Sequence, residues 1–235
     1  MPPWYIRIKS TLDLRMSNRY NKDNVNQVLA LHTSIRDEIV ERLVSFRKLW
    51  ESATEEELFC ELAFCLLTPQ SSAGRCWDKV EEISCSGMLM KGSAEELGEA
   101  LNPIRFRYNK GKYLAAAREL FTRKGTMDVR VVLSAFTSDS EKRGFLVDSV
   151  KGLGYKEASH FLRNVGLGAE LAILDRHILR GMAWLGIIYD EPKTLTPRRY
   201  LEYEKLLAAF AGETGIPMDH LDFVLWYRAR GFIFK

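Results

Sequence analysis

The feature that most constrains the fold is a helix start signal of the form Ser/Thr-x-x-Glu, and three segments of this form mark expected helix starts. The segments are Thr54–Glu57, Ser93–Glu96 and Ser138–Glu141. In such a capping box the hydroxyl accepts the backbone N–H three residues on, and the glutamate accepts the backbone N–H of the hydroxyl residue. Thr196-Pro197 and Pro217 mark two more starts, because proline is favoured in the first helical turn. We therefore expect an almost wholly α-helical protein.

Evidence for β-strands is sparse by comparison. Only Val129–Val132 and, weakly, Trp4–Lys9 have the character of a strand. The sequence contains no internal repeat and no low-complexity tract, and no flexible linker separates the helical segments. We expect about ten helices in a compact arrangement.

Composition excludes several classes of protein. Of the 235 residues, 46% are hydrophobic and 28% are charged, which excludes a disordered or fibrous chain. No apolar stretch approaches the roughly 18 residues that a membrane-spanning helix needs. Arg7, Lys9, Asp13 and Arg15 occupy the region where a signal peptide needs an apolar core. We expect a cytoplasmic protein that does not bind membranes.

The cysteines and histidines do not suggest a metal centre. The four cysteines, at positions 60, 65, 76 and 85, match no common zinc or iron–sulfur spacing. We expect reduced thiols, with Cys60 and Cys65 in the core. His160 and His177 lie seventeen residues apart, with no carboxylate at ligand spacing around either. We therefore predict no metal site formed by side chains.

Positive charge is concentrated in one segment, although the net charge is only +3. The segment from Arg105 to Lys124 contains seven basic residues and one acidic residue, Glu119. The basic residues are Arg105, Arg107, Lys110, Lys112, Arg118, Arg123 and Lys124. Such a run is either a solvated helix face or a stripe that faces phosphates. The run alone does not decide between them.

The segment Lys151–Tyr155 predicts a tight turn between two helices. Gly152 and Gly154 bracket one apolar residue, and glycine reaches positive φ without penalty. A helical apolar face begins directly afterwards with Ala158 and Phe161. Backbone N–H groups at the start of that second helix point outwards and suit a phosphate.

This helix–hairpin–helix pattern resembles the corresponding element of the helix-hairpin-helix/Gly-Asp DNA glycosylase superfamily. The chain is especially similar to the archaeal-type 8-oxoguanine DNA glycosylase/AP lyases. Four further segments carry the resemblance: Glu61–Thr68, Ile104–Arg107, Leu174–His177 and Leu221–Lys235. The similarity runs from about residue 55 to the C-terminus, and residues 1 to about 50 match less distinctly.

The resemblance implies an all-α fold of two lobes with the active site in the cleft between them. Residues 1–55 plus 166–235 would form one lobe, and residues 56–165, ending in the hairpin, the other. It implies a repair enzyme acting on double-stranded DNA that contains oxidised guanine. By default we expect a monomer, associated with the nucleoid through its DNA. As an N-glycosylase it would excise 8-oxoguanine, and as an AP lyase it would cleave the strand at the abasic site.

Two alternatives remain open. The first is a glycosylase of the same fold for another lesion, such as an oxidised pyrimidine or a mismatched base. All four cysteines precede residue 90, so the iron–sulfur cluster of the endonuclease III-like branch is not expected. The second is a non-enzymatic module that uses the hairpin only to hold backbone phosphates.

The catalytic residues implied by the resemblance are Lys156 and Asp175. Lys156 would attack the sugar C1′ and form a Schiff base, and helix position and partial burial disfavour its ammonium form. Asp175, nineteen residues further on, precedes a helical stretch and is also an expected N-cap. It would stabilise positive charge on the sugar. We expect Asp175 near Lys156 without a tight ion pair.

Recognition of the flipped base is assigned by the same resemblance. Asp222 and Trp226 lie four residues apart and hence on one face of the last helix. Trp226 would stack on 8-oxoguanine, Asp222 would meet its donor edge, and the terminal Lys235 would distinguish it from guanine. Phe106 would stack on the opposite face. Gln70 is either a residue presented at the flipped base or the gap it leaves, or part of a plain loop.

The remaining expectations concern the DNA backbone and cofactors. We expect five residues to contact the DNA backbone: Gly152, Gly154, His160, Arg105 and Arg107. No cofactor is expected beyond a monovalent cation at the hairpin carbonyls, which the resemblance implies as a structural ion. The sequence leaves open the opposite-base preference, the balance of the two activities, and the role of residues 1–50.

Overall fold

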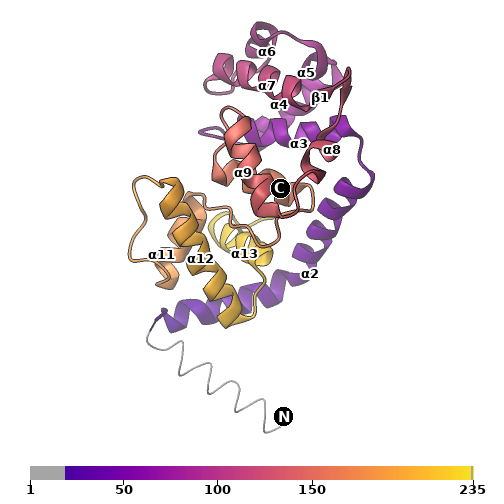
Figure 1. Ribbon diagram of the computed structural model, residues 1–235. Coiled ribbons are helices and arrows are strands. Elements are labelled where there is room, and N and C mark those ends of the chain that lie inside the picture. The colour runs from indigo at the N-terminus through magenta and orange to yellow at the C-terminus, as the bar shows by residue number, and fades with distance from the viewer. Residues whose placement is uncertain (1–18, 234) are drawn as a thin grey trace. The chain divides into compact units, whose positions relative to one another are not determined.

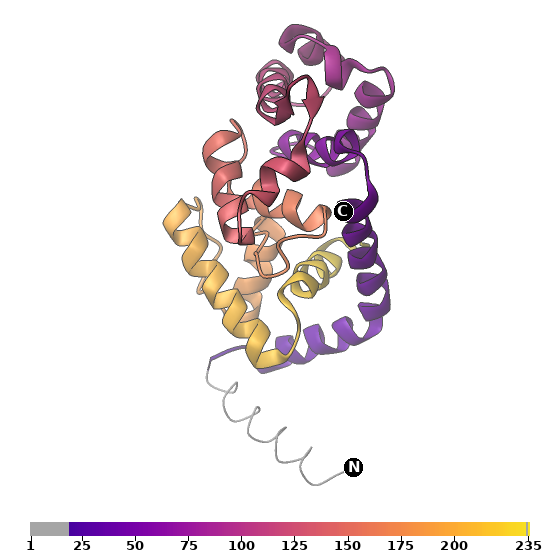
Figure 2. The same cartoon turned by 45° about the vertical axis from the view of Figure 1, so that its right-hand side comes forward.

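The computed structural model describes residues 19–233 and 235, which form helices and one small pair of strands (Figures 1 and 2). The predicted segment Trp4–Lys9 lies outside these residues. The helices are α2 (Lys22–Ser52), α3 (Glu55–Leu67), α4 (Ala73–Cys85), α5 (Met88–Lys91), α6 (Ala94–Ala100), α7 (Arg107–Phe121), α8 (Val129–Ser134), α9 (Asp139–Ser149), α10 (Tyr155–Asn164), α11 (Arg176–Leu185), α12 (Pro197–Thr214) and α13 (Met218–Arg230). The strands β1 (Thr122–Arg123) and β2 (Thr126–Met127) pair antiparallel. The all-α prediction is confirmed.

Local sequence chemistry starts the helices where predicted. All three capping boxes form, at the N-termini of α3, α6 and α9. The Thr196 side chain accepts the N–H of Arg199 at the start of α12. The predicted strand Val129–Val132 is wrong, because it lies in helix α8. Val129 and Leu133, four residues apart, are both buried, and α8 packs against α3.

The chain divides into two units. One comprises the residues up to Arg42 together with Ala169–Lys235, and the other is Leu43–Gly168. The first boundary therefore falls inside α2, whereas the sequence-based division placed it after residue 55. Arg163 lies over the Phe46 ring at 5.5 Å, and a Cβ on Gly166 would lie 2.5 Å from the Arg47 Cα. These contacts tie the end of α2 to the second unit.

Helix α3 is the centre of the Leu43–Gly168 unit. Its residues from Leu58 to Leu67 are all buried. It packs against α4, α7, α8 and α10. A helix buried on every side needs apolar residues all round. Glu61 is the exception, and its carboxylate accepts a hydrogen bond from Asn164 Nδ2 at 3.2 Å.

The other unit is built from α11, α12, α13 and the described residues up to Arg42. α13 packs against both α11 and α12. The Asn21 backbone N–H donates to the carbonyl of Leu185, and Asn24 Nδ2 donates to that of Trp184 at 2.7 Å. The Tyr20 ring meets Phe210 edge-on at 5.1 Å. These contacts fix the start of α2 against the C-terminal helices.

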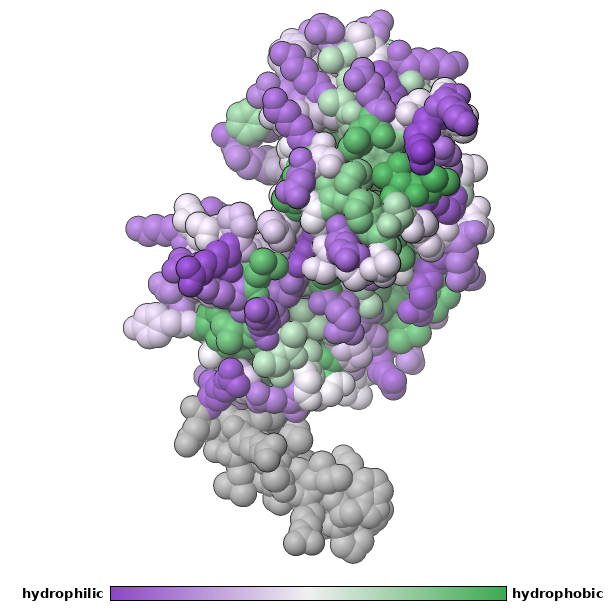
Figure 3. Space-filling view, in the orientation of Figure 1, coloured by the Kyte–Doolittle hydropathy of each residue, from purple (hydrophilic) through white to green (hydrophobic). Residues whose placement is uncertain are grey.

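Charge and hydropathy are mixed on the surface. Hydrophilic residues cover much of the face drawn in Figure 3, with hydrophobic residues gathered in patches. Among the described residues, no helix combines the length and apolar character needed to cross a membrane.

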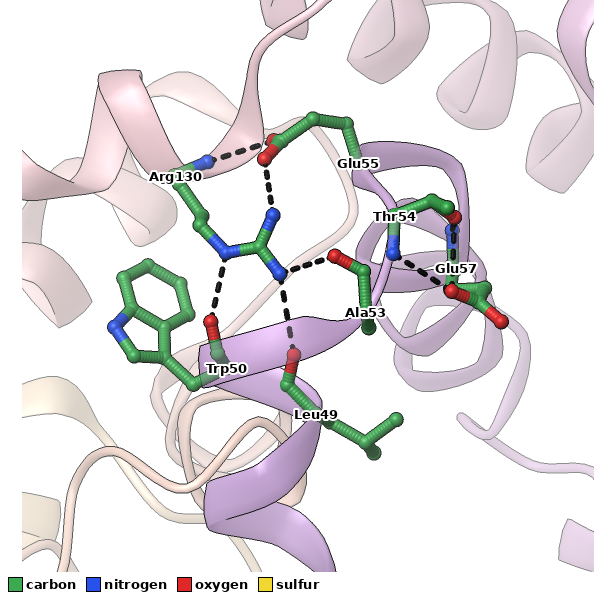
Figure 4. A network of polar contacts seen from close by, with 7 residues as sticks. All are labelled: Leu49, Trp50, Ala53, Thr54, Glu55, Glu57 and Arg130. Atoms are coloured by element: carbon green, nitrogen blue, oxygen red, sulfur yellow. Dashed lines mark hydrogen bonds and ion pairs between the residues drawn. The ribbon is translucent and has the colours of Figure 1, made fainter.

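Arg130 on α8 binds the C-terminal end of α2 (Figure 4). Its guanidinium donates to the Trp50 carbonyl at 2.7 Å, to the Leu49 carbonyl at 3.2 Å, and to the Ala53 carbonyl. It also pairs with Glu55 at 2.5 Å. The last carbonyls of a helix have no partner within the helix, and a cation there also complements the helix dipole. Arg130 therefore joins α2, α3 and α8.

Replacing Arg130 with methionine should lower the free energy of unfolding by about 2–4 kcal/mol, because several hydrogen bonds to a charged group are lost together. Arg198→Met is the matched control, because the Arg198 side chain is 91% exposed and, within the described part of the chain, its ion pair is with Glu202 on its own helix. That change should cost under about 0.5 kcal/mol. Urea unfolding of both variants measures the difference, and equal losses would contradict the structural role of Arg130.

All four cysteines are free, and three of them are buried. Cys60 and Cys65 lie in the core as predicted, and burial raises the pKa of both thiols. Burial raises the pKa of Cys76 to about 11, and only Cys85 is exposed. Because the thiolate is the reactive form, Cys85 alone should react rapidly with a disulfide reagent near neutral pH. Denatured protein should titrate all four thiols, and rapid labelling of Cys65 or Cys76 in the native protein would contradict this packing.

Candidate functional site

The predicted hairpin forms between α9 and α10. The Leu153 N–H donates to the Val150 carbonyl at 3.1 Å, which closes the turn. Gly152 has φ +92°, and a Cβ there would collide with the Tyr113 ring. Gly154 is the N-cap of α10, with no side-chain capping bond. Gly152 is therefore required both by its conformation and by its contact with α7.

Lys156 is the second residue of α10, and its amine is not in bulk solvent. The side chain is 22% exposed, and Nζ lies 3.8 Å from Glu157 Oε1, which is a long ion pair. Burial is the main influence on the Cys65 and Cys76 thiols and raises their pKa values, while the charge of Lys156 acts in the opposite direction. Lys156 thus lies at the helix start behind the hairpin, close enough to α3 and α4 to act on their thiols.

Asp175 is the N-cap of α11, as predicted. Its Oδ1 accepts the backbone N–H of His177 at 2.7 Å and that of Ile178 at 2.9 Å. These bonds hold the carboxylate in one orientation. Lys156 and Asp175 belong to different units. Their expected proximity stays a prediction.

The last helix presents Trp226 beside the start of α11. The Trp226 and His177 rings meet edge-on at 5.1 Å, so α13 contacts the turn that Asp175 caps. Asp222 and Trp226 are both partly exposed, whereas Leu221 and Leu225 are buried. The helix ends at Gly231 with φ +80°, and the terminal Lys235 is half-buried.

Gln70 and Phe106 lie at one pocket, of about 280 Å³, in the Leu43–Gly168 unit. Its lining residues are Leu66, Pro69, Gln70, Phe106, Asn109, Lys110, Tyr113 and Gly152. Phe106 is 51% exposed, and the Arg105 guanidinium lies 4.8 Å from its ring centre. Gln70 and Phe106 both have positive φ, at 57° and 59°. The pocket therefore joins two predicted base-recognition residues to the predicted backbone-binding hairpin.

Two residues predicted to contact the DNA backbone also have protein partners, and their contact with DNA stays a prediction. His160 is only 8% exposed, with its ring edge-on to Phe64 at 5.6 Å, so its burial does not favour a phosphate contact. Arg107 donates to the Tyr108 hydroxyl at 2.8 Å and pairs with Glu99 at 3.3 Å.

The basic run is not one continuous stripe facing phosphates. Lys110 is buried, and Arg118 donates to the carbonyls of Leu89 and Gly92 at 2.9 and 2.8 Å. Within the part of the chain that the structure describes, no cluster of His, Cys, Asp and Glu could hold a metal ion.

The pocket also contains residues that sequence reasoning missed. Lys110 and Tyr113 were not assigned a role, although they lie four and seven residues after Phe106 on α7. Their own spacing of three residues places Lys110 and Tyr113 on one face of α7. It was the only signal in the sequence that could have indicated them.

Two helices joined by a Gly-Leu-Gly hairpin, with a lysine in the first turn of the second helix, define a helix-hairpin-helix DNA glycosylase fold. A family model described as 8-oxoguanine DNA glycosylase matches residues 39–216. An 8-oxoguanine DNA glycosylase/AP lyase from Fusobacterium nucleatum is 42% identical over 210 residues, covering 89% of this chain and 97% of that protein. The chain therefore belongs to the 8-oxoguanine DNA glycosylase family.

Solved structures agree with this assignment. The 8-oxoguanine DNA glycosylase of Methanocaldococcus jannaschii in complex with a 15-mer DNA containing 8-oxoguanine has a TM-score of 0.80 and 34% identity. The match covers 90% of this chain and 99% of that one. The enzyme of Thermotoga maritima has a TM-score of 0.79 and 33% identity, covering 91% and 99%.

Proposed function

We propose that this protein is a bifunctional 8-oxoguanine DNA glycosylase/AP lyase. Family membership gives the reaction class. The observation that carries the assignment in this chain is the placement of Lys156 in the first turn of α10, directly behind the hairpin and largely withdrawn from solvent. An amine held beside a phosphate-binding turn can reach the sugar of a bound strand.

The chemistry uses one nitrogen for two bond cleavages. The neutral Lys156 amine attacks the sugar C1′, and the N-glycosidic bond breaks with its electron pair leaving on the base, which takes up a proton. Asp175 stabilises the positive charge that develops on the sugar. The ring bond between C1′ and O4′ then breaks, and O4′ takes up a proton, which gives a Schiff base between Lys156 and C1′ of the opened sugar. The acidified C2′ proton of this imine permits β-elimination of the 3′ phosphate. Hydrolysis of the imine then frees the enzyme.

The substrate is double-stranded DNA containing oxidised guanine, on which the protein acts as a monomer in the cytoplasm, associated with the nucleoid. Trp226 and Phe106 stack on the extruded base. Asp222 and Lys235 recognise the edge of this base. Gln70 contacts either the base or the gap that the base leaves in the duplex.

Backbone phosphates bind at the hairpin glycines and Arg105. Gly152 is exposed, and the carbonyls of this hairpin would hold the structural monovalent cation, whose positive charge would favour a bound phosphate.

Borohydride reduction of the imine tests this function directly. Wild-type protein should form a covalent adduct with a duplex containing 8-oxoguanine and none with an undamaged duplex. Adducts only with duplexes containing an oxidised pyrimidine or a mismatch would favour a glycosylase for another lesion. Salt-sensitive DNA binding without any adduct would favour a binding module.

Lys235→Met should weaken discrimination between 8-oxoguanine and guanine by roughly tenfold or more, the scale of one hydrogen bond to a charged group. Cleavage at a preformed abasic site should change much less, because no base is read there. Single-turnover rates on the two duplexes give the ratio. Equal losses on both substrates would contradict a recognition role for the terminal lysine.

A further inference from the structure

Lys110 on α7 is a buried cation that the proposed chemistry does not use. It is only 4% exposed, and its Nζ donates to the Leu67 carbonyl at 2.7 Å, the Pro69 carbonyl at 2.9 Å and the Ser71 hydroxyl at 3.1 Å. An ammonium group has three N–H donors, so all are engaged. None of the three acceptors is a carboxylate. Burial is costly for such a charge and lowers the pKa of Lys110.

The acceptors lie on both sides of Gln70 in the loop between α3 and α4. Gln70 has φ +57°, a conformation that residues other than glycine rarely adopt. The Ser71 N–H donates to the Thr68 carbonyl at 3.0 Å, which closes the loop around Gln70. Lys110 therefore holds the residue before and the residue after a strained position.

Phe106 is the N-cap of α7, the helix that carries Lys110, so the Lys110 side chain joins the Gln70 loop to the helix that begins at Phe106. The Lys110 backbone N–H donates to the Phe106 carbonyl at 3.0 Å, and Phe106 has φ +59°. Among the described residues only Gln70, Phe106 and Lys124 are non-glycine residues with positive φ. Two of these three line this pocket, one in the loop that the Lys110 side chain binds and one at the start of α7. Such strained residues persist only where their surroundings fix them, and they cluster at functional sites.

The two residues so held present groups that suit a disrupted base pair. Gln70 is exposed, and Phe106 combines a half-exposed ring with the Arg105 cation stacked on it. An aromatic face binds an unstacked base, an amide pairs with a base edge, and a cation binds the neighbouring phosphate. We infer that together these groups suit duplex DNA around an extruded nucleotide, an arrangement that single-stranded DNA does not provide.

We propose that Lys110 is a positioning residue that sets Gln70 and Phe106 relative to each other for recognition of the duplex around the lesion. The inference rests on the proposed function and deepens it. It separates two tasks. The nucleophile Lys156 reacts with the sugar, while Gln70 and Phe106 bind the duplex around the lesion. Loss of Lys110 therefore affects reaction in a duplex more than reaction with a single strand.

The test compares Lys110→Met with Arg118→Met in the full-length protein. Methionine keeps an apolar stem but removes the donors. Arg118 is the matched control, because it is also a basic residue of α7 whose side chain donates to two backbone carbonyls, those of Leu89 and Gly92. Unlike Lys110, it does not line the pocket. Single-turnover rates are measured on a duplex with 8-oxoguanine opposite cytosine and on a single-stranded oligonucleotide with an abasic site.

Lys110→Met should lower the duplex rate relative to the single-strand rate by about tenfold to a hundredfold, the scale expected from misplaced contacts. Arg118→Met should leave that ratio unchanged, and Lys110→Arg should restore part of it. In addition, 2-aminopurine beside the lesion should show weaker base unstacking with Lys110→Met. An unchanged ratio, or an equal change with Arg118→Met, would overturn the inference.

Two further results keep the test decisive. If Lys110→Met does not fold, Ser71→Ala removes one of the three acceptors and should lower the same ratio a few-fold, and no change would overturn the inference. Absence of a borohydride adduct with wild-type protein would refute the proposed function itself. A normal wild-type adduct with an unaltered ratio for the variants would refute only the role of Lys110.

Discussion

Lys156→Gln should abolish the borohydride-trapped adduct and reduce both base excision and strand cleavage by on the order of a thousandfold or more. An amide nitrogen is not a nucleophile, because its lone pair is delocalised into the carbonyl, and it cannot form an imine. Glutamine is shorter than lysine but occupies a similar path in the first turn of α10. Among residues 19–233 and 235, Lys156 makes only a long ion pair with Glu157, so the variant should remain folded.

Lys151→Gln is the control for this prediction. Lys151 is exposed in the same hairpin and offers the nearest alternative amine in the sequence. This variant should retain the adduct, with at most weaker binding at high salt. Adduct formation by Lys156→Gln, or its loss in Lys151→Gln, would reassign the nucleophile.

The fold was predictable where short-range chemistry decides the structure. Capping boxes act within four residues, so Thr54, Ser93 and Ser138 mark true helix starts. The segment Val129–Val132 was misjudged because its strand character is short. Burial of one helical face against α3 outweighs that preference. The division of α2 between two units had no local signal, because the helix is continuous across it.

The candidate site was predictable where it is local and not where it depends on distant contacts. The Gly152 turn and the Asp175 cap follow from neighbouring residues, and both form. The role of Lys110 depends on acceptors about forty positions earlier in the chain, and a basic residue in a basic run gives no sign of burial. The same holds for His160, whose burial depends on α3.

Asp175→Asn separates the two roles of this residue, because the variant keeps a helix cap but loses a charge. Asparagine caps helices about as well as aspartate, so the N–H groups of His177 and Ile178 keep an acceptor. The free energy of unfolding should change by under about 0.5 kcal/mol, and DNA binding should persist. Excision of 8-oxoguanine should slow by several orders of magnitude, because the positive charge on the sugar loses its counterion at a fixed position.

The substrate and a second variant make this prediction specific. Cleavage of a preformed abasic site should suffer less than excision, because no base has to depart and Lys156 can still form the imine. Asp175→Ala should add a stability loss of about 1 kcal/mol from the missing cap without a much larger catalytic defect than Asp175→Asn. Single-turnover rates and urea unfolding measure the two effects separately. If Asp175→Asn excised 8-oxoguanine within tenfold of the wild-type rate, the carboxylate would be a helix cap alone, and the charge that assists base departure would have to come from another residue.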